Sequence, residues 1–106
     1  MYELPGELVL KVDKNGESEN KNEWRVWNQI KNTDKAAWFA PCVDLTKDGL
    51  IMVRTYPLDR RGYPDEVPGF FGDIKYRNFG ILNGIFVCHD YQYILGGSGM
   101  KKAKWR

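Results

Sequence analysis

The stretch FGILNGIFVCHDYQYILGG, residues 79–97, decides between two folds for this chain. In the first fold, Asn83-Gly84 is the tight turn of a β-hairpin, because this dipeptide readily adopts the positive φ angles that such turns need. The segment after the turn is rich in β-branched and aromatic residues, which is typical of strands. The hairpin register places four pairs opposite each other: Leu82 with Ile85, Phe79 with Cys88, Arg77 with Asp90, and Tyr76 with Tyr91.

In the second fold, the same stretch is a helix over residues 79–95, ended by Gly96-Gly97 in the left-handed conformation. Gly84 would then lie inside the helix, at a cost of about 1 kcal/mol relative to Ala. Local propensity therefore favours the hairpin, although the helical spacing is also present. The helix would gather on one face the side chains of Leu82, Ile85, Phe86, His89 and Tyr93.

The chain has 106 residues, which is the length of one domain, so we expect a single domain over residues 1–106. Its hydrophobic content of 42% and aromatic content of 14% are sufficient for a packed core. The formal net charge of +2 is small and argues against a nucleic-acid partner. Cys42 and Cys88 are predicted to be free, buried thiols rather than a disulfide.

No apolar run approaches the ~18 residues of a membrane-spanning helix. The first ten residues, MYELPGELVL, lack the basic region and apolar core of a secretory signal. We therefore expect a protein without a signal peptide or a transmembrane segment, located in the cytoplasm of the cell that produces it or in a virion.

The first half of the chain predicts two strands followed by a β-hairpin. Alternating apolar and polar residues indicate strands at 7–12 and 23–30, separated by a polar loop with Asn15-Gly16 as its turn. Residues 43–58 predict a hairpin around Asp48-Gly49.

Between and after these strands, the sequence predicts less regular structure. A short helix is expected after Thr33 and before Pro41. Residues 59–73 contain three Gly and two Pro and predict a long, packed loop. Four aromatic residues are expected in the core: Trp24, Trp27, Trp38 and Phe39.

The second half of the chain resembles a family of phage and prophage domains of unknown function. Eight residues separate Gly80 from His89-Asp90-Tyr91-Gln92-Tyr93, which matches the Gly and His-Asp-x-x-Tyr spacing of the family. Residues 64–71, PDEVPGFF, resemble its Thr-Asp-x-x-Ser-x-Pro segment, and residues 100–103 resemble the start of its last helix. The resemblance implies that His-Asp-x-x-Tyr lies on a helix.

The chain also departs from the family pattern at two positions. Glu66 stands near the place of the motif serine, and Lys104 stands where the family has Asp. With the resemblance included, we predict an α+β fold, a small and mainly antiparallel β domain with one helix near 79–95. An all-β fold with a hairpin at Asn83-Gly84 is the alternative.

The resemblance implies a protein of phage or prophage type that acts by protein–protein contact. It would serve as a virion component, associated with tail or capsid, or as an accessory factor, in an oligomeric or particle assembly and without a cofactor. The end of the chain adds cations and an indole that predict contact with an acidic or pocketed partner surface. These candidate binding residues are Lys101, Lys102, Lys104, Trp105 and Arg106.

An enzymatic alternative comes from a second resemblance, because His-Asp-x-x-Tyr on a helix is similar to the secretory phospholipases. This resemblance implies His89 as general base, Asp90 as a Ca²⁺ ligand and Tyr93 as support for a second carboxylate. A histidine base suits neutral pH, and Ca²⁺ takes oxygen ligands. The orienting carboxylate is not identified by spacing, and the candidates are Asp44, Asp48, Asp59, Asp65 and Asp73.

A structural or catalytic zinc site is not expected. It would need Cys42, Cys88 and His89 together, and neighbouring Cys88 and His89 point in different directions in either fold. We therefore predict no metal site in the absence of the phospholipase-like chemistry, and we expect that the protein is not an enzyme.

Overall fold

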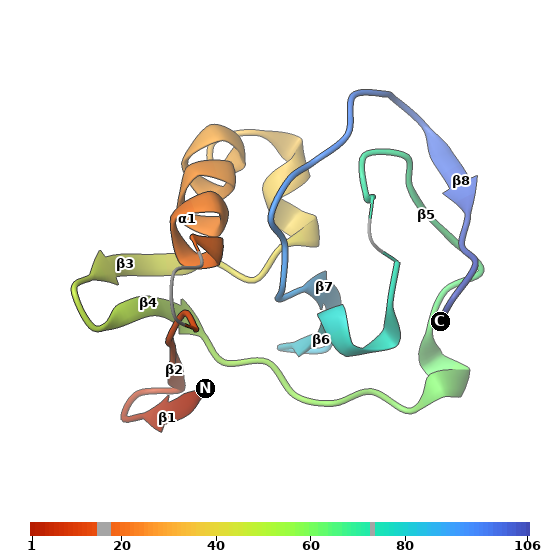
Figure 1. Cartoon of the computed structure of the whole chain (residues 1–106). Coiled ribbons are helices and arrows are strands. Elements are labelled where there is room, and N and C mark those ends of the chain that lie inside the picture. Colours follow the sequence, from red (N-terminus) through yellow and green to blue (C-terminus); the bar gives the residue numbers. More distant parts are fainter. Residues whose placement is uncertain (15–17, 73) are drawn as a thin grey trace.

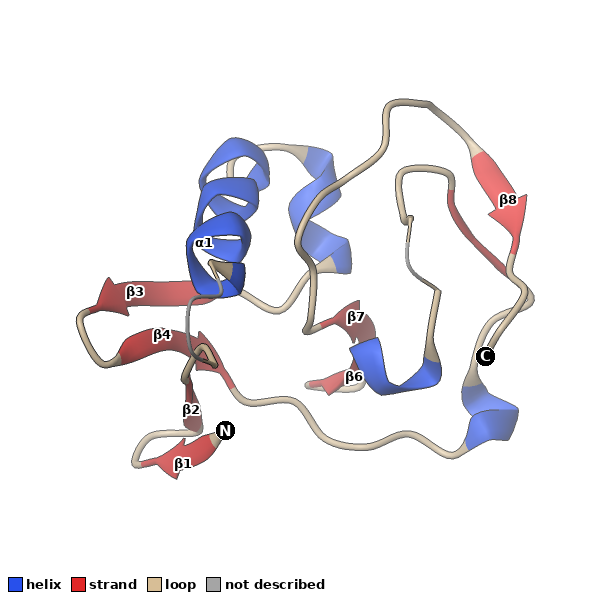
Figure 2. Cartoon of the chain, viewed as in Figure 1, coloured by secondary structure: helices blue, strands red, loops and turns tan. Residues whose placement is uncertain are grey.

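The computed structural model describes residues 1–14, 18–72 and 74–106. Within those ranges the chain forms one α-helix and eight short strands that pair in antiparallel sheets (Figure 2), which confirms the predicted α+β class. The Asn15-Gly16 turn predicted from the sequence, and Asp73, lie outside the described residues. No helix in the described part combines the length and apolar character that a membrane crossing requires.

The main sheet has the strand order β1-β2-β4-β3. Its strands are β1 (Tyr2–Leu4), β2 (Leu8–Lys11), β3 (Cys42–Thr46) and β4 (Gly49–Val53). The helix α1 (Glu19–Ile30) packs against β3 and β4, as Figure 1 shows. The strands predicted at 7–12 and in 43–58 are confirmed by this sheet.

The turn between β3 and β4 follows from two residues. The Thr46 hydroxyl accepts the N–H groups of Asp48 and Gly49 at 3.1 and 3.2 Å. Gly49 has a φ of 151°, and a Cβ there would lie 2.1 Å from the carbonyl oxygen of Lys11. Glycine is therefore required for β4 to pair closely with β2.

The predicted helix over 79–95 is wrong, and the hairpin at Asn83-Gly84 is present instead. It consists of β6 (Phe79–Leu82) and β7 (Ile85–Cys88). Asn83 and Gly84 both have positive φ angles, 51° and 79°, as a tight hairpin turn requires. Local turn chemistry thus outweighs the helical spacing. The register pairs Leu82 with Ile85 and Phe79 with Cys88, as the hairpin alternative predicted.

The hairpin ladder does not continue beyond Phe79 and Cys88. Residues Tyr76–Asn78 form a 3-10 turn, η3, so Arg77 with Asp90 and Tyr76 with Tyr91 are not cross-strand pairs. The helix that the resemblances imply for His-Asp-x-x-Tyr is therefore wrong. Membership of the phage family itself stays a prediction.

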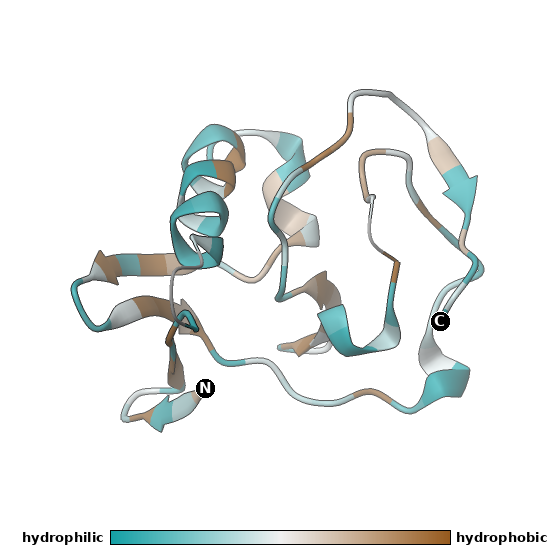
Figure 3. Ribbon diagram, viewed as in Figure 1, coloured by the Kyte–Doolittle hydropathy of each residue, from teal (hydrophilic) through white to brown (hydrophobic). Residues whose placement is uncertain are grey.

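The strand predicted at 23–30 is also wrong, because this segment belongs to α1. The buried positions of α1 are Asn20, Glu23, Val26 and Ile30, spaced three, three and four residues apart as a helix face requires. Two of these four side chains are polar. Figure 3 accordingly shows α1 as largely hydrophilic with short hydrophobic patches, so its sequence gives no clear apolar stripe.

The final segment is a strand rather than the start of a helix. Residues 100–102 form β8 (Met100–Lys102), which pairs with β5 (Glu66–Pro68), so the last helix implied by the resemblance is wrong. The segment predicted as a loop at 59–73 thus contains β5 and a 3-10 turn, η2 (Arg60–Gly62). The short helix predicted after Thr33 is confirmed as η1 (Asp34–Trp38), a 3-10 turn capped by the Thr33 hydroxyl.

The core is built around Phe39, which is 2% exposed. Its ring lies 4.7 Å from that of Tyr91 and 5.2 Å from that of Phe71, so it joins the region after η1 to two later segments. The prediction of a core role for the aromatic residues is confirmed, since Trp24, Trp27 and Trp38 pack partly buried against this core. The prediction of free, buried thiols is confirmed for Cys42 and Cys88.

Candidate functional site

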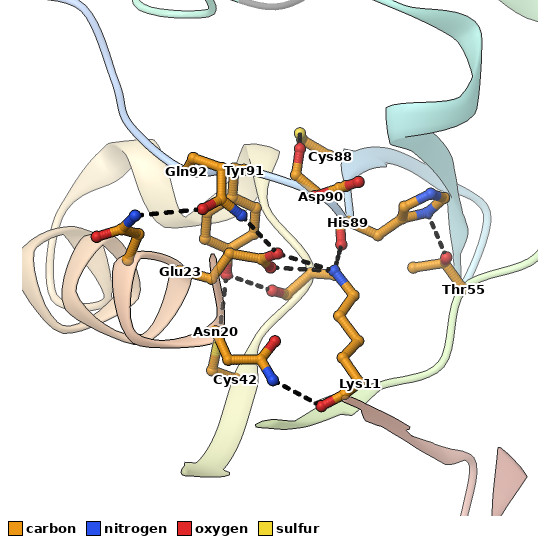
Figure 4. Close-up of polar contacts among 12 residues, drawn as sticks. Lys11, Asn20, Glu23, Cys42, Thr55, Cys88, His89, Asp90, Tyr91 and Gln92 are labelled. Atoms are coloured by element: carbon orange, nitrogen blue, oxygen red, sulfur yellow. Dashed lines mark hydrogen bonds and ion pairs between the residues drawn. The ribbon is translucent and has the colours of Figure 1, made fainter. Parts of the chain in front are cut away.

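The imidazole of His89 is held at both of its nitrogens. Nε2 lies 2.7 Å from the carbonyl oxygen of Arg77, and Nδ1 lies 2.7 Å from Oγ1 of Thr55 (Figure 4). A carbonyl only accepts, so Nε2 carries the proton and Nδ1 accepts the Thr55 hydroxyl. Burial lowers the pKa of His89. The ring is therefore neutral near pH 7 and fixed in one tautomer.

Gly80 makes this contact possible. A Cβ at this position would lie 3.1 Å from both His89 Nδ1 and Thr55 Oγ1, and 2.8 Å from the carbonyl oxygen of Tyr56. The segment after β4, which carries Thr55, reaches the site because Tyr56 exchanges backbone hydrogen bonds with Ile81 of β6 at 2.8 and 2.9 Å. The Gly and His spacing seen in the sequence thus has a structural reason, which is close approach of Thr55 to His89.

Thr55 and His89 lie on the wall of a cavity of about 470 Å³. We call it the apolar cavity, because most of its lining is aliphatic or aromatic. It lies between the main sheet, the β6–β7 hairpin and the chain from 53 to 63. Its lining consists of Met1, Val9, Lys11, Met52, Val53, Thr55, Tyr56, Pro57, Leu58, Arg60, Tyr63, Tyr76, Arg77, Phe79 and His89.

A buried ion pair lies behind His89. The two carboxylate oxygens of Glu23 accept from the Lys11 ammonium at 3.1 and 3.0 Å, and Gln92 Nε2 donates to Glu23 at 3.3 Å. Lys11 also donates to the carbonyl oxygen of His89, as Figure 4 shows. Glu23 is only 2% exposed. These contacts join α1, β2 and the segment after β7.

Burial dominates the electrostatics of this ion pair. It raises the pKa of Glu23 to about 8, the Lys11 ammonium opposes the rise, and the Asp90 carboxyl adds to it. At pH 7 the Glu23 carboxyl is therefore mostly protonated, and the contact with Lys11 becomes an ion pair only above a pH of about 8. Removing either partner would leave the other buried without it. Glu23 and Lys11 therefore fix how the three segments meet.

The structure does not assemble the phospholipase-like site predicted from His89, Asp90 and Tyr93. Asp90 is exposed, and its side chain reaches Glu23 rather than the His89 ring. Tyr93 is half-exposed, lies over Gly72 and lines with Asp90 a second hollow of about 270 Å³. Neither ring nitrogen of His89 bonds to a carboxylate, so the described geometry lacks an orienting acid.

The cysteines have a packing role. Cys42 Sγ lies 3.3 Å from the Tyr91 hydroxyl, and Cys88 Sγ donates to the carbonyl oxygen of Asp90 at 3.4 Å. Burial raises the pKa of Cys42 to about 11 and also raises the pKa of Cys88. Both thiols are therefore protonated and unreactive near pH 7. The described residues contain no group of three or more His, Cys, Asp or Glu placed to hold a metal ion.

The predicted binding residues of the C-terminal segment are dispersed. Trp105 packs inward, with Nε1 donating to the carbonyl oxygen of Pro64 at 2.8 Å. Lys101 donates to the carbonyl oxygen of Phe71. Lys102 and Lys104 are exposed. Arg106 lines a hollow of about 420 Å³ beside the apolar cavity.

We call this last space the basic hollow, and its lining residues are Arg60, Lys75, Tyr76, Arg77 and Arg106. Sequence reasoning missed Thr55, Lys11, Arg60 and Arg77 as site residues. Of these four residues, only Arg60 lies in the Gly- and Pro-rich stretch 59–73, and loops of this length are often functional.

Comparison with known proteins does not place the chain in a family. No family model matches the chain, and neither a curated protein nor a solved structure is detectably similar to it.

Proposed function

We propose that this chain is a non-catalytic binding domain that acts by protein–protein contact, and that the apolar cavity receives an apolar side chain of the partner. The apolar cavity carries the proposal. Its volume of about 470 Å³ lies within the ~300–1,000 Å³ of typical binding pockets. Mostly apolar walls with a few fixed polar groups, here Thr55 and His89, are also typical of such pockets.

Burial of one large apolar side chain in the cavity would contribute about 1.5–3 kcal/mol to binding. A few such buried anchors dominate the energetics of most protein interfaces. The wall is already ordered, because Thr55, His89 and Gly80 lock one another in place. A partner side chain therefore meets a preformed site and avoids much of the ordering cost.

The resemblance to phage and prophage domains implies a partner within a virion or an accessory complex. This part of the proposal rests on the sequence alone.

The binding proposal is tested with a minimal apolar probe, N-acetylphenylalanine amide, against N-acetylalanine amide in amide NMR titrations. We expect millimolar binding of the first probe, with shifts confined to residues around the cavity such as Thr55, Leu58 and Phe79. Leu58→Arg should abolish these shifts, because it places a charge in the cavity wall. Leu95→Arg is the matched control, since Leu95 is 41% exposed and does not line the cavity.

Equal responses to the two probes, or unchanged shifts in Leu58→Arg, would contradict the proposal. An unfolded Leu58→Arg variant is recognised from its own spectrum, and Leu58→Trp, which fills the cavity without a charge, then replaces it.

A second candidate function is a hydrolase with His89 as general base. One observation favours it: the 2.7 Å contact between His89 Nδ1 and Thr55 Oγ1 has the geometry of a base beside a hydroxyl nucleophile. The second ring nitrogen of His89 bonds to the carbonyl of Arg77, where a catalytic triad has a carboxylate. A neutral carbonyl stabilises a protonated imidazole less than a carboxylate does.

Release of p-nitrophenolate from p-nitrophenyl butyrate, measured with and without Ca²⁺, separates the two functions. For a binding domain, the wild type, Thr55→Ala and His89→Ala should all match the background rate. A wild-type rate that both substitutions abolish, with folding intact, would support the hydrolase instead.

A further inference from the structure

The basic hollow adjoins the apolar cavity. The two spaces have Arg60, Tyr76 and Arg77 in common as lining residues. A group seated in the cavity therefore lies directly beside the cations of the hollow. The occupant of one space and the occupant of the other can belong to the same short segment.

Among the described residues, the two arginines at this boundary have no acidic partner. Arg60 places its guanidinium carbon 4.6 Å from the centre of the Tyr76 ring. Arg77 is exposed at its side chain, while its carbonyl oxygen is fixed by His89 Nε2. In the part of the chain that the structure describes, neither guanidinium is ion-paired with a carboxylate.

We infer that the partner segment carries acidic residues next to its apolar anchor, and that Arg60 and Arg77 bind their carboxylates. This inference rests on the proposed function, because it assumes that the apolar cavity is occupied. The planar guanidinium of Arg60, held over the Tyr76 ring, and the exposed guanidinium of Arg77 suit carboxylates, which such groups contact through paired N–H donors. The apolar side chain supplies affinity, and the carboxylates supply orientation and selectivity.

A protein segment fits these observations better than a nucleic acid does. The net charge of the whole chain is only +2, so the positive charge of the hollow is local. Nucleic-acid recognition usually requires a basic face or stripe that follows many phosphates. One or two carboxylates beside an apolar anchor match a hollow of about 420 Å³.

Three peptides with blocked ends test the inference. The first is acetyl-Gly-Phe-Gly-Asp-Asp-Gly-amide, the second has Asn in place of both Asp, and the third has Gly in place of Phe. Affinities are measured by NMR titration at about 50 and about 300 mM salt. We expect the first peptide to bind about tenfold more tightly than the second at low salt, and the difference to shrink at high salt.

Single substitutions locate the effect on the protein. Arg60→Gln and Arg77→Gln should each reduce the preference for Asp over Asn by about three- to tenfold. Arg61→Gln is the matched control, because it removes the same charge from a neighbouring residue whose side chain is 95% exposed. Arg77→Gln keeps the carbonyl that holds His89, so the cavity wall is preserved.

The possible outcomes separate this inference from the proposed function. Equal affinity for the Asp and Asn peptides would overturn the inference and leave the apolar cavity as a binding site. Failure of both Phe-containing peptides to bind would overturn both. Tighter binding of an oligothymidylate or of phosphatidylserine vesicles than of the first peptide would also overturn the choice of an acidic protein segment.

Discussion

Two aromatic-walled spaces share the same three rings, and of the described residues Trp105 fills one of them while the other is open. Tyr63, Tyr76 and Phe79 contact Trp105, with ring centres 4.8, 5.5 and 5.1 Å from the indole. The same three residues line the apolar cavity. Trp105 fills the first space, which we call the filled side. The second space is the apolar cavity, which we call the open side.

The difference separates a structural contact from a binding site. Trp105 is anchored through Nε1 as well as through its ring, so the filled side is complete in itself. The open side has ordered polar groups, Thr55 and His89, on its wall. An aromatic cluster seen in the sequence does not reveal which of these two roles it has.

Emptying the filled side should have the largest effect. Trp105→Ala removes a partly buried indole and its hydrogen bond to Pro64, and we expect the free energy of unfolding to fall by about 3–4 kcal/mol. Urea denaturation measures this loss. Trp105→Phe keeps a ring in the space and should lose only about 1–2 kcal/mol. Similar losses for the two variants would show that the indole is not packed as described.

The buried contact of Glu23 with Lys11, a lining residue of the apolar cavity, should make the free energy of unfolding depend on pH. The pKa of Glu23 is raised from 4.5 to about 8, so folding favours the neutral carboxyl. Its contribution is complete below pH 4.5 and is lost as the pH rises through 8. We expect a loss of about 3–4 kcal/mol between pH 5 and 8 that is absent in Glu23→Gln.

The difference between these two proteins isolates Glu23, because all other groups titrate in both. His89 acts in the opposite direction, since its lowered pKa reduces stability as the pH falls below about 6.5. A wild-type profile parallel to that of Glu23→Gln would contradict the raised pKa.

Loosening the wall of the open side should have a moderate effect. Thr55→Val keeps the shape of the side chain but leaves His89 Nδ1 without its donor, and we expect a loss of about 1–2 kcal/mol. The same change should weaken binding of the N-acetylphenylalanine amide probe. Ser98→Ala, at an exposed position, should change neither quantity.

Filling the open side should have the smallest effect on stability. Leu58→Trp places an indole at the cavity wall, and we expect the free energy of unfolding to rise by about 0.5–1 kcal/mol. Probe binding should be lost at the same time. A stabilised variant that still binds the probe would show that the cavity is not its site.

Local chemistry allowed part of the fold to be predicted from the sequence. Asn83-Gly84 and Asp48-Gly49 act within a few residues, and both hairpins they specify are present. Of the four pairs expected around Asn83-Gly84, the two nearest the turn are formed. The helix predicted near 79–95 is wrong because Asn83 and Gly84, with positive φ angles, form a tight turn inside it. The α1 helix was missed because Asn20 and Glu23 occupy its buried face.

The site could not be predicted because its contacts are distant in the sequence. His89 meets Thr55 across 34 positions, and Glu23 meets Gln92 across 69. His89 itself was identified, but as a base and not as a part of a cavity wall. Only the Gly80 to His89 spacing pointed to the correct place, since it reflects the close approach of Thr55.

The contacts of Glu23 also determine when α1 can fold. A helix of 12 residues is marginal by itself in water. The carboxyl of α1 needs Lys11 from β2 and Gln92 from the segment after β7 before its burial is tolerated. We therefore expect α1 to dock only after residues 89–92 are in place. The two halves of the sequence should then fold together in one cooperative step, and not as two independent units.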